Sequence, residues 1–215
     1  RNTKSLLIPY GFKISQFEVQ KTRVNPPFVI GFVGRLDIYT KGLDLLIKAF
    51  SDFQHKEPET ELWIIGDSAQ RPALERLAGS KNISDKVKFF GSRFGAEKDE
   101  LIQKMDVFVH ASRNEGLPAS VIEASNSGVP SVVTEATNVA SYIRNFNAGI
   151  AVPDEDNKAI TAALHTLYEM KKEGTLVNLS RNAQTMVRTA FDWDKLVVDF
   201  DKLYALINKS KAFCD

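Results

Sequence analysis

The sequence predicts an α/β protein whose core is a doubly wound, Rossmann-like parallel sheet. Short apolar runs rich in β-branched residues alternate with helical patterns between residues 28 and 152. The inner runs are continuously apolar, which is typical of strands that are covered on both faces. After residue 157 only helical patterns remain. Together these observations favour parallel strands linked by helices, with additional helices at the C-terminal end.

The individual elements follow in order along the chain. We expect strands at Leu6 to Ile8, Phe28 to Val33, Glu61 to Gly66, Lys86 to Gly91, Asp106 to Ala111, Pro130 to Thr134 and Gly149 to Val152. We expect helices between them at Gly42 to His55, Pro72 to Gly79, Lys98 to Lys104, Pro118 to Asn126 and Val139 to Phe146.

The C-terminal region from Asn157 to Asn208 is predicted to be helical, with breaks near Gly174 and near Phe191-Asp192-Trp193. Its first and last helices carry apolar residues at the spacing of a buried stripe. These residues are Leu164, Leu167 and Tyr168 on the first helix, and Leu196, Phe200, Leu203, Tyr204 and Ile207 on the last.

The chain is expected to divide into three segments. The sequence Asn25-Pro26-Pro27 interrupts any regular element. Residues 1–25 are therefore interpreted as a linker and opening segment, residues 26–190 as a ligand-binding Rossmann-like domain, and residues 191–215 as a final helix.

The composition argues against several functional classes. The 215 residues include 28 Lys and Arg and 27 Asp and Glu, a net charge of +1, so no nucleic-acid partner is expected. The one cysteine, Cys214, leaves no internal disulfide and fits a cytoplasmic protein. No apolar run approaches the roughly 18–20 residues that cross a bilayer, so we expect no transmembrane segment.

The most informative segment contains two glutamates, Glu115 and Glu123, around a predicted strand–helix junction. Glu115 follows the strand, and Glu123 lies one to two turns inside the helix. Pro118 fits the first helical position, where its missing N–H is not needed. The unpaired N–H groups of a helix start bind anions, so this arrangement suggests a ligand that carries both negative charge and hydroxyl groups.

Glu123 could also be an ordinary solvated residue of a helix. Its neighbours Val121 and Ile122 have the character of core residues, and a carboxylate close to a core needs a partner or a cleft. We therefore favour a cleft position for both glutamates.

A second group of polar residues occurs in Gly34-Arg-Leu-Asp-Ile-Tyr-Thr-Lys-Gly42, which follows the first central strand. Ligands of open α/β sheets bind at the carboxyl ends of the strands. Arg35 offers a planar fork for phosphate oxygens and Lys41 a compact charge, so together they suit a diphosphate. The alternative is that both are solvated surface charges.

Several common sites are absent from the sequence. No GxGxxG, GxxxxGK[ST], HExxH or CxxC pattern occurs, so we expect no NAD, no P-loop nucleotide site and no metal. His55 and His165 are interpreted as surface or packing residues. His110 ends the strand before Glu115; it could line the cleft, but a packed position at the strand end is preferred.

The order of these motifs resembles the carboxy-terminal half of family-4 glycosyltransferases, which are retaining enzymes of the GT-B fold. The resemblance rests on GRL…KG, on IIGDSAQRPALERLA, and on VKFFGSRFGAEKDELIQKMDVFVHASRNEGLPASVIEASNSGVPSVVT. Ile8-Pro9-Tyr10-Gly11-Phe12 is similar to the start of that half, and Phe191-Asp192-Trp193 to its closing Phe-x-Trp. The segment Ala136 to Ser141 lacks the family's usual Gly-Gly-x-Pro-Glu.

The resemblance implies a UDP-, GDP- or ADP-sugar as donor substrate and no required cofactor. It implies that Arg35 and Lys41 neutralise the diphosphate leaving group, that Glu115 contacts the transferred sugar, and that Glu123 accepts hydrogen bonds from the ribose. The remaining donor contacts implied are the backbone of Gly116, Leu117 and Pro118 at the helix start, Gly34, and the loop Gly91, Ser92 and Arg93 near the base.

The resemblance also implies a missing amino-terminal domain that binds a glycan or lipid-linked acceptor, with the final helix crossing back to it. The intact protein would then be a hexosyltransferase of polysaccharide or lipid-linked glycan assembly, peripheral to the inner face of the membrane, and this chain alone would be inactive. A nucleotide-sugar epimerase or phosphorylase on the same architecture, and a non-catalytic binding module, remain as alternatives.

Overall fold

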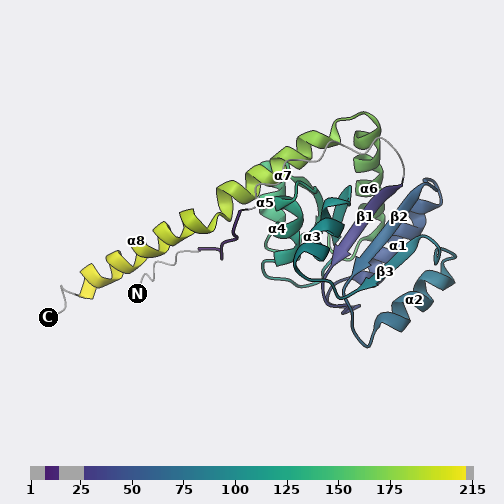
Figure 1. Ribbon diagram of the computed structural model, residues 1–215, viewed down its shortest axis with the longest axis horizontal. Coiled ribbons are helices and arrows are strands. Elements are labelled where there is room, and N and C mark those ends of the chain that lie inside the picture. Colours follow the sequence, from purple (N-terminus) through teal and green to yellow (C-terminus); the bar gives the residue numbers. More distant parts are fainter. Residues whose placement is uncertain (1–7, 15–26, 212–215) are drawn as a thin grey trace.

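The computed structural model describes residues 8–14 and 27–211 (Figure 1). In this part of the chain, six strands form one sheet in the order β3-β2-β1-β4-β5-β6, and all the strand pairs are parallel. The strands are β1 (Phe28–Val33), β2 (Thr60–Ile65), β3 (Val87–Gly91), β4 (Val107–His110), β5 (Ser131–Thr134) and β6 (Gly149–Val152).

Helices cover both faces of the sheet. They are α1 (Leu43–Gln54), α2 (Arg71–Ser80), α3 (Gly95–Gln103), α4 (Ala119–Asn126), α5 (Ala140–Phe146), α6 (Asn157–Lys172), α7 (Leu176–Ala190) and α8 (Trp193–Lys211). On one side α1 packs against α2 and α6, and on the other α4 and α5 pack against α7. The expected α/β fold class is therefore confirmed.

The central strand β1 explains why the apolar runs are continuous. Phe28, Ile30 and Phe32 enter the core on the side of α1 and α6, whereas Val29 and Val33 enter the core on the side of α4 and α7. Side chains alternate along a strand, so a strand that is buried on both faces needs apolar residues at every position.

Most expected boundaries agree with the structure to within one residue, but three expectations need correction. Helix α3 begins at Gly95 rather than Lys98, because its first turn is polar and carries no apolar period. Pro118 is the N-cap of α4, with extended backbone, rather than its first helical residue. The expected strand at residues 6–8 lies mostly outside the described residues, and its last residue, Ile8, is not in a strand.

The connections place the carboxyl ends of β1 and β4 side by side in the middle of the sheet. From β1 the chain runs to β2 and β3 on one side, then returns to β4 on the other side of β1. The segments that leave β1 and β4 therefore lead to strands on opposite sides, and a crevice is expected where the strand order reverses. Ligands of such sheets bind at this point of reversal.

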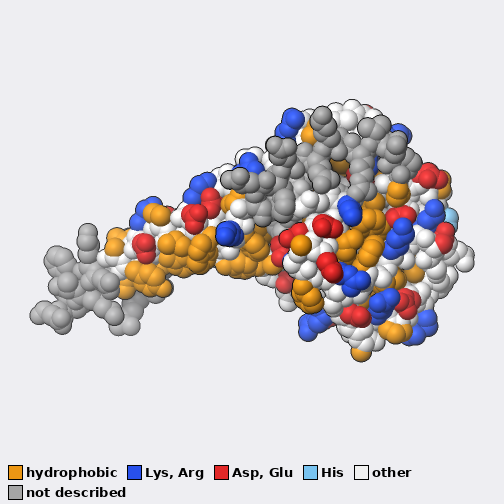
Figure 2. Space-filling model, in the orientation of Figure 1, with side chains coloured by type: hydrophobic (Ala, Val, Ile, Leu, Met, Phe, Trp, Pro, Cys, Tyr) orange, Lys and Arg blue, Asp and Glu red, His pale blue; other side chains and the backbone are white. Residues whose placement is uncertain are grey.

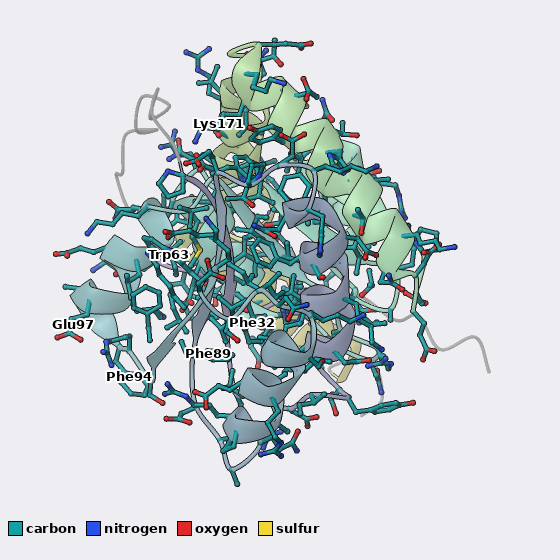
Figure 3. The ribbon with its side chains drawn as sticks, turned by 90° about the vertical axis from the view of Figure 1, so that its right-hand side faces the viewer. Phe32, Trp63, Phe89, Phe94, Glu97 and Lys171 are labelled. Carbon is teal, nitrogen blue, oxygen red and sulfur yellow. The ribbon has the colours of Figure 1, made fainter. Side chains whose placement is uncertain are left out.

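An ion pair lies at the end of the sheet where the strands begin, opposite to their carboxyl ends. Lys171 of α6 lies at the strand end remote from Phe94 (Figure 3), with its Nζ 2.7 Å from Oδ1 of Asp106. The other carboxylate oxygen, Oδ2, accepts the N–H of Val29 at 2.8 Å. Both charged side chains are nearly buried, at 12% and 11% exposure, so Asp106 links α6 to the amino end of β1.

The apolar stripes of the first and last C-terminal helices differ in how much of their surface is buried. Leu164 and Leu167 of α6 are fully buried, as expected. Among the described side chains of the expected stripe on α8, Leu196 is buried, Phe200 and Leu203 are half-buried, and Tyr204 and Ile207 are 61% and 43% exposed, so the expected burial fails toward the end of the helix. The helix leaves the globular body (Figure 1), and its apolar residues form a band on its surface (Figure 2).

The start of α8 is joined to the opening segment by backbone hydrogen bonds. The N–H of Phe12 donates to the carbonyl of Phe191 at 2.7 Å, and the N–H of Trp193 donates to the carbonyl of Phe12 at 3.1 Å. Gly11 permits this approach, because a Cβ there would lie 2.7 Å from the Cα of Trp193. None of the described helices has both the length and the apolar character needed to cross a membrane.

We expect Lys171→Met to lower the free energy of unfolding by about 3 kcal/mol, because it leaves the nearly buried Asp106 carboxylate without its cation. Urea unfolding of the purified chain measures this loss. Lys202→Met is the matched control, since the Lys202–Asp199 pair of α8 is exposed and such pairs contribute about 0–1 kcal/mol. Equal effects of the two substitutions would contradict the structural role of Lys171.

Candidate functional site

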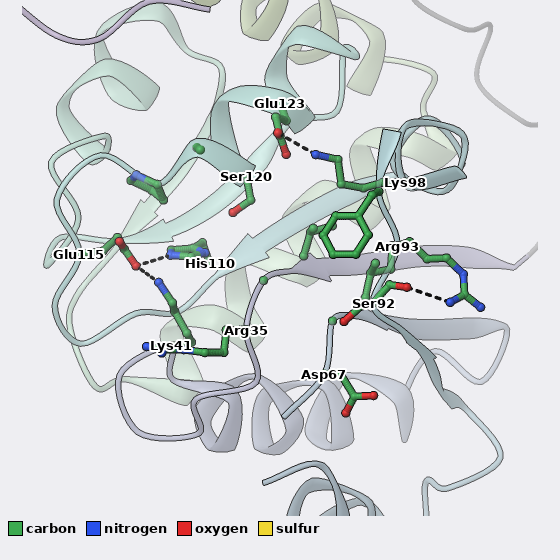
Figure 4. Close-up of a pocket in the computed structure, with 17 residues that line it drawn as sticks. Arg35, Lys41, Asp67, Ser92, Arg93, Lys98, His110, Glu115, Ser120 and Glu123 are labelled. Atoms are coloured by element: carbon green, nitrogen blue, oxygen red, sulfur yellow. Dashed lines mark hydrogen bonds and ion pairs between the residues drawn. The ribbon is translucent and has the colours of Figure 1, made fainter. Parts of the chain in front are cut away.

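A pocket of about 540 Å³ opens at the carboxyl end of the sheet (Figure 4). Its walls come from the segments that follow β1, β2, β3 and β4 and from the first turns of α4. The lining residues are Val33, Gly34, Arg35, Lys41, Ile65, Gly66, Asp67, Ser92, Arg93, Phe94, Lys98, His110, Glu115, Pro118, Ala119, Ser120 and Glu123.

The pocket brings together most of the residues that the sequence singled out. Arg35, Lys41, Glu115 and Glu123 all line it, as do Gly34, Ser92, Arg93 and Pro118. Three expected residues, Gly91, Gly116 and Leu117, are not in its lining. The backbone of Gly116 and Leu117 serves neighbouring segments instead: their carbonyls accept the N–H of Asn138 and the hydroxyl of Tyr10, respectively.

One side of the pocket holds an ion pair between Lys41 and Glu115, which come from different loops (Figure 4). The two side chains are only 19% and 24% exposed. His110 and then Lys41 act on the carboxylate and lower the pKa of Glu115 from 4.5 to about 2, although partial burial opposes this shift. Glu115 is therefore a carboxylate at any physiological pH.

Arg113 locks the two loops that carry this pair. Its guanidinium makes two hydrogen bonds with the carboxylate of Asp44, at 2.8 and 3.1 Å, and one with the carbonyl of Tyr39 at 2.8 Å. It also lies over the ring of Tyr39, 4.6 Å from the centroid. The N–H of Arg113 donates to the carbonyl of Thr40 at 3.0 Å, so the loop after β4 is bonded directly to the residue before Lys41.

Gly42 allows this close contact. Its φ is +62°, and a Cβ at this position would lie 1.9 Å from the carbonyl oxygen of Ala111. Both the left-handed backbone and the lack of space favour glycine. The glycine after Lys41 therefore keeps the two loops in contact.

A third segment supports Glu115 from the other side. The N–H of Glu115 donates to the carbonyl of Ala136 at 3.3 Å, and Glu115 forms an isolated bridge with Thr137. This is the segment in which the chain lacks the Gly-Gly-x-Pro-Glu sequence. It contributes backbone hydrogen bonds to the glutamate loop, and its residues do not line the pocket.

At the other side of the pocket Glu123 pairs with Lys98 of α3, with 2.8 Å between Nζ and Oε1 (Figure 4). The sequence analysis did not single out Lys98. The residues before it on α3 are exposed. Nothing in the local sequence pattern distinguishes Lys98 from the other charged residues of this helix. Asp67, in the segment after β2, and Phe94, just before α3, were also missed, because no sequence pattern marks them.

The start of α4 presents backbone amides to the pocket. Pro118 is the N-cap, and Ala119 and Ser120 line the pocket just after it. The first N–H groups of a helix have no partner within the helix and carry its positive end. This part of the pocket therefore suits an anion, as the sequence suggested.

Arg35 is the most exposed of the expected cations: its side chain is 76% exposed and lies 3.9 Å from Asp37. His110 is both packed and in the lining: its ring is 1% exposed, and its Nε2 lies 3.6 Å from Oε2 of Glu115. Among the described residues, no group of three His, Cys, Asp or Glu side chains could hold a metal ion.

Comparisons with known proteins agree on one family. The family model described as "Glycosyl transferases group 1" matches residues 14–186. A D-inositol 3-phosphate glycosyltransferase from Salinispora tropica is 27% identical over 186 residues, which cover 82% of this chain and 38% of the relative. The chain thus spans well under half the length of this curated relative.

Solved structures share the fold. Sucrose-phosphate synthase from Thermosynechococcus elongatus superimposes with a TM-score of 0.81 at 22% identity, over 95% of this chain and 53% of that one. Anabaena Alr3699/HepE, solved in complex with UDP, superimposes with a TM-score of 0.76 at 23% identity, over 91% of this chain and 56% of that one. The chain therefore spans about half of each of these proteins.

We expect the Glu115 carboxyl to titrate near pH 2 rather than at its ordinary value of 4.5. Because the folded-state pKa is lowered, its stabilising effect is complete above pH 4.5 and is lost as the pH falls toward 2. Carbon NMR of the side-chain carboxyl measures the midpoint, and Lys41→Met should raise it. Lys104→Met, at an exposed position outside the pocket, should leave the midpoint unchanged. Equal midpoints in the two variants would contradict the pairing of Lys41 with Glu115.

Proposed function

The chain belongs to the group 1 glycosyl transferases, and from this membership we propose that it is the donor-binding domain of a retaining hexosyltransferase. The pocket would hold a nucleoside diphosphate sugar. The observation that carries the proposal is the convergence of Lys41, Arg35, the amides at the start of α4 and two carboxylates on one hollow.

The cationic side of the pocket suits the diphosphate. Lys41 and Arg35 would neutralise its oxygens, and the amides at Ala119 and Ser120 would donate to them. Departure of the diphosphate builds negative charge on these oxygens, which fixed cations and the helix start stabilise. Negative charge develops on the diphosphate whenever its sugar is transferred. The groups that bind the diphosphate would therefore also stabilise the transition state.

The carboxylates suit the sugar and the ribose. Glu115, held ionised by its neighbours, would face the transferred sugar as positive charge develops at the anomeric carbon. Glu123 would accept hydrogen bonds from the ribose hydroxyls, and Ser92 and Arg93 would lie near the base. A UDP complex is known for Alr3699/HepE, which shares the fold; this supports a nucleoside diphosphate here and leaves the base open among UDP, GDP and ADP.

We further propose that the chain corresponds to the carboxy-terminal half of a family-4 enzyme with the GT-B fold. Its length relative to the similar proteins supports this assignment. The exposed apolar residues of α8 would then pack on a preceding domain that binds a glycan or lipid-linked acceptor.

Nucleoside diphosphates should stabilise the chain. Saturation at 100 times the Kd adds about 2.7 kcal/mol to the free energy of unfolding. Thermal unfolding with UDP, GDP and ADP would identify the base, and Lys41→Ala and Glu123→Ala should abolish the shift. Glu100→Ala on α3 and Lys104→Ala at the C-cap of α3, two exposed positions outside the pocket, should retain it. No stabilisation by any of the three nucleotides would favour a non-catalytic module over a transferase.

The chain alone should bind donor but transfer its sugar extremely slowly. A half-site cannot orient donor and acceptor, and that orientation contributes rate factors on the order of 10⁵ or more. Release of UDP from UDP-glucose, followed with and without the rest of the protein, measures the difference. Comparable turnover by the chain alone would refute the missing-domain proposal.

A further inference from the structure

His110 is a buried histidine without a hydrogen bond. Within the described part of the chain, neither of its ring nitrogens has a hydrogen-bond partner. Leaving a buried polar group unpaired lowers the stability of the fold. Such groups are rare in folded proteins, and an unpaired group in a binding pocket is a candidate for a functional role.

The ring of His110 is fixed in orientation. It stacks against Phe32 of β1, with centroids 6.0 Å apart and planes inclined by 13°, and against Phe108 of β4 at 6.5 Å and 11°. Rotation of the imidazole toward another partner would break both contacts. The edge that carries Nε2 therefore stays directed at the pocket, as Figure 4 shows.

Three groups meet at one oxygen atom. Oε2 of Glu115 pairs with Nζ of Lys41 and lies 3.6 Å from Nε2 of His110. The distance to His110 is longer than a hydrogen bond, so in the free pocket Lys41 is the partner that Glu115 holds. His110 already lowers the pKa of Glu115 from this distance, but its Nε2 is too far from Oε2 to donate a hydrogen bond.

The charges around His110 favour its neutral form while Lys41 remains in place. Burial lowers the pKa of His110 and the positive charge of Lys41 lowers it further, whereas Glu115 acts in the opposite direction. The other charged residues of the pocket have partners of their own. Arg35 lies beside Asp37 and Lys98 pairs with Glu123. Arg93 lies 3.6 Å from Glu97, and Asp67 lies 3.9 Å from Arg71. The strands next to the ring place Phe32, Phe108 and Val133 beside it, and none of these residues titrates.

A diphosphate changes this balance, and here the inference rests on the proposed function. Phosphate oxygens compete with Glu115 for the ammonium of Lys41. Once Lys41 turns to the diphosphate, its charge is neutralised there and Glu115 loses its cation. We propose that His110 then takes up a proton from solvent and, as an imidazolium, donates Nε2–H to Oε2 of Glu115.

In this scheme His110 is a positioning residue that acts through Glu115. One proton passes from the solvent to the ring, and no other bond is made or broken. The imidazolium replaces the lysine as partner of the carboxylate, so Glu115 stays ionised and oriented while Lys41 serves the leaving group. A leucine or phenylalanine at residue 110 would fill the same space but could not make this exchange.

Calorimetric titration of the chain with UDP tests the proposal. Near pH 7.5, in two buffers with different ionisation enthalpies, the wild type should take up a fraction of a proton per UDP bound. His110→Phe, which keeps the aromatic stack, should bind UDP without that uptake. His55→Gln, at an exposed position on the end of α1, should take up protons like the wild type.

A second measurement tests the proposal on the wild type, so it does not depend on the folding of His110→Phe. Proton–nitrogen NMR of the wild-type imidazole should show a higher titration midpoint for His110 with UDP than without it. Lys41→Met should raise the midpoint even without UDP, because it removes the cation that disfavours the charged ring.

The outcomes separate the two proposals. UDP binding with no change at His110, or with equal proton uptake in His110→Phe, would overturn the role of this histidine and leave the donor site intact. Failure of the wild type to bind any nucleoside diphosphate would overturn the donor site, and the role of His110 with it.

Discussion

The ion pair between Lys41 and Glu115 is the interaction on which the candidate site depends. The two residues lie 74 positions apart and meet only because β1 and β4 are neighbours at the point where the strand order reverses. The loops that carry them lead to strands on opposite sides of the sheet. Arg113, bonded to Asp44 and to the carbonyl of Tyr39, and Gly42, pressed against Ala111, keep the loops in contact.

Internal charge pairing also explains how the pocket remains stable when it is empty. Each of the two carboxylates holds a lysine, Lys41 on Glu115 and Lys98 on Glu123. Unpaired cations in a partly buried hollow would repel each other and lose hydration. A ligand that carries both phosphates and hydroxyls can exchange partners with these pairs, because its anionic part takes the lysines and its hydroxyls donate to the carboxylates. Ligands that lack one of these parts would leave charges without partners.

Much of the fold and part of the site could be predicted from the sequence. The continuous apolar run of β1 follows directly from burial on both faces of a sheet, and parallel connectivity places the ends of β1 and β4 at one edge. Arg35, Lys41 and Glu115 were identified because each lies close to a strand end or a helix start, and Glu123 because its neighbours on the helix are apolar. The predicted roles of these residues rest on the family resemblance and await the experiments above.

The tertiary structure decided what depends on contacts between distant segments. Lys98 reaches Glu123 because α3 folds over the sheet edge, and no periodicity records that approach. His110 is both packed between aromatic rings and directed at the pocket, two interpretations that the sequence treated as alternatives. The stripe on α8 has the spacing of a buried face, yet Leu196 alone of its five residues is buried, and Tyr204 and Ile207 are exposed. A local pattern specifies which face of an element is apolar, whereas the surface that covers that face is determined by the rest of the fold.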